Sequence, residues 1–195
     1  MVASITVITP YHPGDLGKAY TEAMRRFEPD EWVCFTDHDA MFTTDKWYYQ
    51  LQHAIERYPG AGLFTAKTNR IGIRSQVHDP VKSRTERMPS VGSVVWTSKG
   101  NSHDMVHHYR VGQLLLDTHG STGIDISNDI SNGIMICTQK KIFDKVGSFR
   151  PGFGGQDTDY HRAVVKLGYK VYLLKGLYMY HWYRQHLFIP ESPDG

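Results

Sequence analysis

Residues 31–42 read EWVCFTDHDAMF, and this stretch decides the expected fold. Its first part, residues 32–36, is a nearly continuous apolar run that is typical of a buried strand, and Asp37, His38 and Asp39 follow directly. The two aspartates are therefore expected at the carboxyl end of a core strand. Open α/β sheets bind their ligands at that edge. The stretch thus predicts a sheet and the place of a site on it.

The segments on either side alternate between strand and helix patterns. Apolar, β-branched runs predict strands over 4–9, 32–36, 61–65, 133–138 and 169–174. Apolar residues at helical spacing, bounded by Pro and Gly, predict helices over 16–27, 45–58, 140–146 and 157–167, the second of them capped by Asp45. Strands that alternate with helices indicate an α/β fold with a mostly parallel central sheet flanked by helices.

The middle of the chain, residues 69–127, has a weaker pattern. It is polar, punctuated by glycine and rich in histidine, with a modest helical signal only around Met105 to Leu116. We expect this part to be irregular and to form an insertion in a single domain that spans residues 1–195. An aromatic tail, Tyr178 to Phe188, follows the last predicted strand.

Composition excludes several classes of function. A chain of 195 residues with 40% hydrophobic residues can bury one core, and a net charge of +2 provides no basic field for nucleic acid. Cys34 and Cys137 lie in apolar runs and are expected to be small core residues, not a disulfide. No apolar run approaches the length of a membrane span, and the first residues do not resemble a signal peptide. We therefore expect a cytoplasmic protein without a membrane span.

The acid pair and two downstream features carry the expected chemistry. Two carboxylates one residue apart can hold Mg²⁺ or Mn²⁺ with a bound diphosphate, although a lone pair of this kind is more often a turn after a strand. Gly154 to Asp159, GGQDTD, delivers carboxylates at the start of a helix, where acids also serve as simple caps. His181 lies just beyond the last strand, and a neutral imidazole there can complete a metal site, although a lone histidine among aromatics is more often packed or solvent-facing.

Taken in order, several segments resemble the GT-A glycosyltransferases, especially the family-2 type and galactosyltransferase-like members. They are ITVITPY, LGKAYTEAM, EWVCFTDHDAMF, the stretch from SNGIMICT through FGGQDTDYHRAVVKLGYKVYLL, and a late histidine. The resemblance covers most of the chain outside the middle segment, residues 69–127, which it implies to be an insertion on the acceptor side. It implies a single-domain GT-A fold and the metal-dependent transfer of a sugar from a UDP- or GDP-sugar to a hydroxyl of a glycan or other acceptor.

The resemblance also implies roles for individual residues. Metal ligands would be Asp39, Asp37 and His181, and the catalytic base would be Asp157, with Asp159 as the second choice. The nucleotide-sugar contacts that we expect are Thr9, Pro10, Tyr11, Asp37, His38, Gly154 and Gly155. The chain departs from the family in two ways: one nucleotide-binding strand is missing, which makes it a minimal form without the acid that contacts the base, and Gln156 stands where the family often has glutamate.

Two other functions remain open from the sequence. A haloacid-dehalogenase-like phosphatase also places a D-x-D pair after an apolar strand, with the first aspartate as nucleophile, but Met41 stands where that family usually has threonine or valine. A non-catalytic nucleotide- or sugar-binding module is the other alternative.

Overall fold

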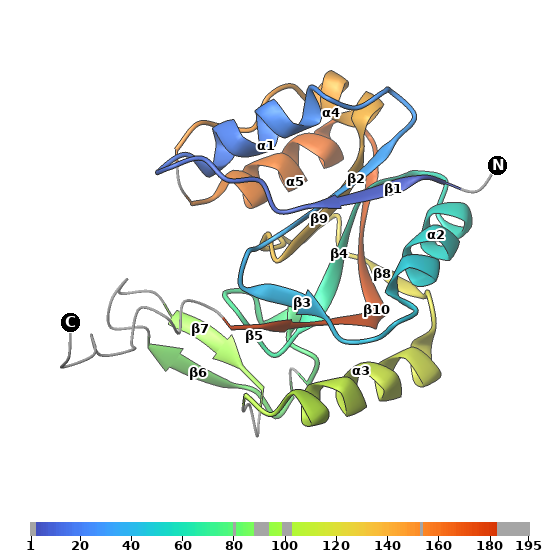
Figure 1. Cartoon of the computed structure of the whole chain (residues 1–195), viewed down its shortest axis with the longest axis vertical. Helices are drawn as coiled ribbons and strands as arrows, with labels where there is room; N and C mark the ends of the chain where they lie inside the picture. The colour runs from blue at the N-terminus through green and yellow to red at the C-terminus, as the bar shows by residue number, and fades with distance from the viewer. Residues whose placement is uncertain (1–2, 80, 88–93, 99–102, 153, 183–195) are drawn as a thin grey trace.

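The computed structural model describes residues 3–79, 81–87, 94–98, 103–152 and 154–182. A sheet of seven strands lies at its centre in the order β1-β2-β9-β4-β10-β3, with β8 also paired to β10 (Figure 1). Its strands are β1 (Ile5–Ile8), β2 (Trp32–Thr36), β3 (Ala40–Phe42), β4 (Ala61–Thr68), β8 (Gly123–Asp125), β9 (Met135–Gln139) and β10 (Lys170–His181).

The sheet is mixed, which corrects the prediction of a mostly parallel one. β1 and β2 are parallel, as are β4 and β10, but β9 lies between β2 and β4 and is antiparallel to both. β3 and β8 are antiparallel to β10. The chain enters β9 from Asn132 and Gly133, beside the end of β2, so this strand has to run back from that edge. An apolar run predicts a strand without specifying its direction.

Helices cover both faces of the sheet (Figure 1). α1 (Leu16–Met24), α4 (Lys140–Val146) and α5 (Gln156–Lys166) pack on one face, and α2 (Trp47–Arg57) packs on the other. Because successive strand residues point to opposite faces, Val33 and Phe35 of β2 join the core under α1, whereas Trp32 and Cys34 join the core under α2. Both layers hold the carboxyl end of β2 in a fixed place.

The predicted helix boundaries agree with the structure to within a few residues, and their caps explain the differences. The Asp15 carboxylate accepts a 2.8 Å hydrogen bond from the Lys18 N–H and caps α1. The N-cap of α2 is Lys46, which makes no side-chain cap, and not Asp45 as predicted. Gly154 and Gly155 precede α5 with φ values of 92° and 82°, a left-handed conformation that favours glycine at both positions.

The middle segment is more ordered than predicted. A second sheet in the order β5-β7-β6 is built from β5 (Arg70–Ile71), β6 (Arg84–Arg87) and β7 (Val94–Thr97), with a short 3-10 helix, η1 (Arg74–Gln76), after β5. α3 (Met105–His119) then packs against β10. The helical signal around Met105 to Leu116 is confirmed by α3. The expectation of an irregular segment is wrong for β5, β6 and β7, because short strands of this kind are stabilised by pairing with each other and not by their own sequence pattern.

Three further expectations from the sequence concern the aromatic tail, the two cysteines and membrane-spanning helices. The start of the predicted tail, from Tyr178 to His181, is strand, and the tail beyond Trp182 lies outside the described residues. Cys34 and Cys137 occupy paired positions of β2 and β9, and both are buried free thiols, as predicted. Among the described residues, none of the helices has the length and apolar character that crossing a membrane requires.

Candidate metal and donor site

Two carboxylates and one imidazole meet at the edge of the sheet. Asp37 and Asp39 follow β2, and His181 is the last residue of β10, where it pairs with Ala40 of β3. His181 Nε2 lies 3.3 Å from Asp39 Oδ1 and 3.6 Å from Asp37 Oδ2. One ligand atom from each residue falls within 4.8 Å of the others, and in the described part of the chain no further group of three such side chains is this compact.

The surroundings of His181 fix the ring in the form that binds a metal. Its Nδ1 lies 2.9 Å from the Arg70 carbonyl oxygen, which can only accept, so Nδ1 carries the proton. A cation bound beside Asp37 and Asp39 would then take the lone pair of Nε2. Metal-bound histidines commonly donate their second N–H in this way, so the donor set fits a divalent cation held by two carboxylate oxygens and one imidazole nitrogen.

Asn69 holds the backbone of His181 on both sides. The His181 N–H donates to Asn69 Oδ1 at 2.7 Å, and Asn69 Nδ2 donates to the His181 carbonyl at 3.1 Å. The Trp182 N–H also donates to the Asp39 carbonyl at 2.8 Å. Because these bonds tie the end of β10 to the turn after β2, the three side chains are positioned before any ligand arrives.

Asp37 carries the clearest electrostatic signature of the site. Burial, together with the negative charges of Asp39 and Asp157, raises the pKa of Asp37 to about 6, although His181 and His38 oppose the shift. Two carboxylates placed together in a partly buried site repel each other when both are ionised. A bound cation would remove that repulsion, which is why such an acid pair is a suitable site for one.

A pocket of about 500 Å³ opens over this trio and gathers most of the predicted site residues. All three proposed metal ligands and Asp157 line it, as do all the residues predicted to contact the nucleotide sugar: Thr9, Pro10, Tyr11, Asp37, His38, Gly154 and Gly155. The glycine-led turn before α5 and the acid pair therefore line one cavity. Asp159 is the single predicted site residue that does not line it.

Asp157 and Asp159 have different surroundings. Asp157 Oδ2 accepts from the Gly133 N–H at 2.6 Å and from Asn132 Nδ2 at 3.2 Å, and Oδ1 accepts from the Thr158 N–H at 2.8 Å. A carboxylate has about four lone-pair positions, so Oδ1 keeps one for a substrate hydroxyl. Asp159 has a side chain 45% exposed and is bound to Arg150 Nε at 2.7 Å.

Several residues of the pocket were not predicted from the sequence. Tyr20, Asn132 and Gln156 line it, and the buried atoms Asn132 Oδ1 and Gln156 Nε2 have no hydrogen-bond partner in the described structure. Gln76 fixes the position of Asn132, since its Oε1 accepts from the Asn132 N–H at 2.7 Å and its Nε2 donates to the Asn132 carbonyl at 3.1 Å. An Asn-Gly pair just before an apolar run was the available signal for this loop.

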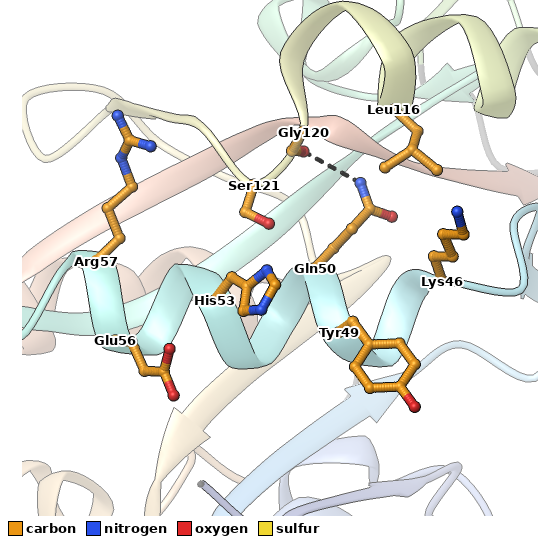
Figure 2. A pocket seen from close by; sticks show the side chains of 9 residues that line it. All are labelled: Lys46, Tyr49, Gln50, His53, Glu56, Arg57, Leu116, Gly120 and Ser121. Atoms are coloured by element: carbon orange, nitrogen blue, oxygen red, sulfur yellow. Dashed lines mark hydrogen bonds between the residues drawn. The ribbon is translucent and has the colours of Figure 1, made fainter.

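A second depression, of about 640 Å³, lies between α2 and the end of α3, and none of the predicted site residues lines it. Figure 2 shows Gln50 and His53 of α2 directed toward the Gly120 to Ser121 turn, where Gln50 Nε2 donates to the Gly120 carbonyl at 3.1 Å. His108 of α3 lines neither of these two pockets, and its Nδ1 lies 2.8 Å from the hydroxyl of Tyr178 in β10.

Comparison with solved structures identifies the fold. The chain is similar to GalNAc-T7 in a crystal structure with UDP, GalNAc and Mn²⁺, with a TM-score of 0.56 and 12% sequence identity. The similarity covers 88% of this chain but only 31% of that one. No protein-family model matches the sequence, and a search of curated proteins finds no relative. The fold is therefore GT-A-like, as the sequence segments predicted.

Proposed function

We propose that this chain is a metal-dependent glycosyltransferase that moves a sugar from a nucleotide-sugar donor, a UDP- or GDP-sugar, to a hydroxyl of a glycan or other acceptor with inversion. One observation carries the proposal: the Asp37, Asp39 and His181 trio and the Asp157 turn line the same pocket of a GT-A-like fold. The neighbouring structure, which holds UDP, GalNAc and Mn²⁺, supports the class of donor and of metal.

The ligand atoms suit Mn²⁺ or Mg²⁺, with Asp39 and His181 as ligands and Asp37 as a ligand or a contact to the nucleotide ribose. When bound, the cation would neutralise charge on the departing nucleoside diphosphate. Thr9, Pro10 and Tyr11 follow β1 and line the pocket, where they would contact the nucleotide. Gly154 and Gly155 would allow the donor to approach the backbone closely, since neither carries a side chain.

Asp157 is the proposed catalytic base. The acceptor oxygen forms a bond to the anomeric carbon, the bond from that carbon to the diphosphate oxygen breaks with both electrons leaving on the diphosphate, and the acceptor proton passes to Asp157. The base and the metal trio line the same pocket, and an acceptor that attacks from the side of Asp157 would displace a diphosphate held by the metal from the other face of the anomeric carbon. That arrangement predicts inversion at the anomeric carbon.

The decisive experiment is a titration of UDP and GDP into the protein with and without MnCl₂, followed by measurement of nucleoside diphosphate release from a panel of nucleotide sugars. We expect binding that requires the metal and is abolished in Asp39→Ala. Phosphate release from phosphomonoesters in the same protein would instead favour the phosphatase alternative. Nucleotide binding without any turnover would favour the non-catalytic module, and no metal-dependent nucleotide binding would refute both the enzyme and the module.

A further inference from the structure

Tyr20 has an unusual position in the pocket. Its side chain is only 2% exposed and belongs to the core between α1 and the sheet, yet it lines the same cavity as Asp37 and Asp157. A buried tyrosine hydroxyl usually has a hydrogen-bond partner. None is found for Tyr20 among the residues that the structure describes, so its hydroxyl is available to a ligand that enters the pocket.

Aromatic packing fixes the ring and therefore the direction of the hydroxyl. The Tyr20 ring centroid lies 4.7 Å from that of Phe35 and 5.0 Å from that of Phe149. Phe35 is two positions before Asp37, and side chains at that spacing along an extended chain share a face. The ring is consequently held on the α1 side of β2, near the end of the strand that Asp37 follows.

The charges around the hydroxyl determine which hydrogen-bonding role it can take. Burial raises the pKa of Tyr20 far above its ordinary value, and the negative charges of Asp37 and Asp157 raise it further. The group consequently stays protonated and can donate. A hydroxyl donor that shares the pocket with these acids and the proposed metal ligands matches an anionic oxygen that occupies this space only when the ligand is bound.

We infer that the Tyr20 hydroxyl donates a hydrogen bond to a diphosphate oxygen of the nucleotide sugar, and that it stabilises the charge left on the diphosphate as the sugar departs. The inference rests on the proposed function and adds a catalytic residue to it. Uncharged donors aimed at developing negative charge act well in a site that is shielded from water. The other unpartnered donor of this wall, Gln156 Nε2, would assist from the start of α5.

Tyr20→Phe tests the inference, because it removes the hydroxyl and keeps the ring. The matched control is Tyr160→Phe: Tyr160 also stacks on Phe149, with centroids 4.4 Å apart, but its hydroxyl lies 3.0 Å from Thr138 Oγ1 and does not reach the pocket. The affinity for UDP and for GDP in the presence of Mn²⁺ is measured by calorimetry, together with the affinity for Mn²⁺ alone and the melting temperature.

We expect Tyr20→Phe to bind the preferred diphosphate roughly tenfold to a hundredfold more weakly, the loss typical of one hydrogen bond to a charged group. Mn²⁺ binding should be unchanged, and Tyr160→Phe should retain the diphosphate affinity of the wild type. Equal diphosphate affinity in Tyr20→Phe and wild type would overturn the inference alone. A weaker affinity for Mn²⁺ without nucleotide would also overturn it, because the hydroxyl would then act on Asp37. If wild type binds neither diphosphate, the proposed function itself fails.

Discussion

Removing the charge of Asp37 should stabilise the metal-free protein and destroy its response to metal. Burial and neighbouring acids raise the pKa of Asp37 from 3.8 to about 6. Its side chain is largely shielded from water, with 30% of it exposed, so ionising the carboxyl has an electrostatic cost in the folded protein. This rise in the pKa corresponds to a loss of about 3 kcal/mol in the free energy of unfolding once the carboxyl is ionised.

The direction of this pH dependence follows from whether the folded or the unfolded chain holds the proton more tightly. Below pH 4 the carboxyl is protonated in both the folded and the unfolded chain, and Asp37 costs nothing. As the pH rises from about 4 to about 6, the unfolded chain loses the proton first, so the folded state becomes less stable, and the full cost persists at higher pH. Asp37→Asn cannot ionise and should be more stable than wild type by about 3 kcal/mol at pH 8, and equal to it near pH 4.

The assay is thermal unfolding at pH 4 and pH 8, with EDTA or with MnCl₂. For a chain of this size, about 3 kcal/mol corresponds to a difference of roughly 6 to 12 °C at pH 8 in EDTA. Excess Mn²⁺ should raise the melting temperature of the wild type by mass action and should have little effect on Asp37→Asn. Asp30→Asn is the control, since the Asp30 side chain is 89% exposed. An equal advantage of Asp37→Asn at both pH values, or Asp37→Asn melting below wild type at pH 8 in EDTA, would refute this electrostatic account.

Three further predictions concern Asn69, the two acids of α5 and His78. Asn69→Ala should weaken Mn²⁺ binding by about 10- to 100-fold by releasing His181, and calorimetry that finds unchanged affinity would show that His181 is held without it. Asp157→Asn should lower turnover by orders of magnitude while donor binding is kept, whereas Asp159→Asn should have little effect; equal losses measured by diphosphate release would contradict the assignment of the base. Burial lowers the pKa of His78 to about 4. The free energy of unfolding of the wild type should therefore fall by up to about 3 kcal/mol as the pH falls from 6.5 to 4, because the unfolded chain takes up the proton first. Chemical denaturation of His78→Phe should show a smaller fall over the same pH range.

Local pattern along the chain determined much of the fold. Apolar runs located β1, β2, β4, β9 and the first half of β10, because a buried strand needs a continuous apolar segment whatever its partners are. Helical periodicity located α1, α2, α4 and α5 for a similar reason. The position of Asp37 and Asp39 at a strand end was equally local, since the acids simply follow the run.

The tertiary structure decided everything that depends on contact between distant segments. The packing of the elements sets the antiparallel direction of β9 and the pairing of the small second sheet. It also places Asp157, and not Asp159, in the lining of the pocket. The proton position on His181 depends on the Arg70 carbonyl, and Tyr20, which has the spacing of an ordinary core residue of a helix, reaches the pocket only through the packing of α1 on the sheet. Spacing along a chain predicts which face a side chain occupies within its own element, but only packing determines which atoms from other elements meet it there.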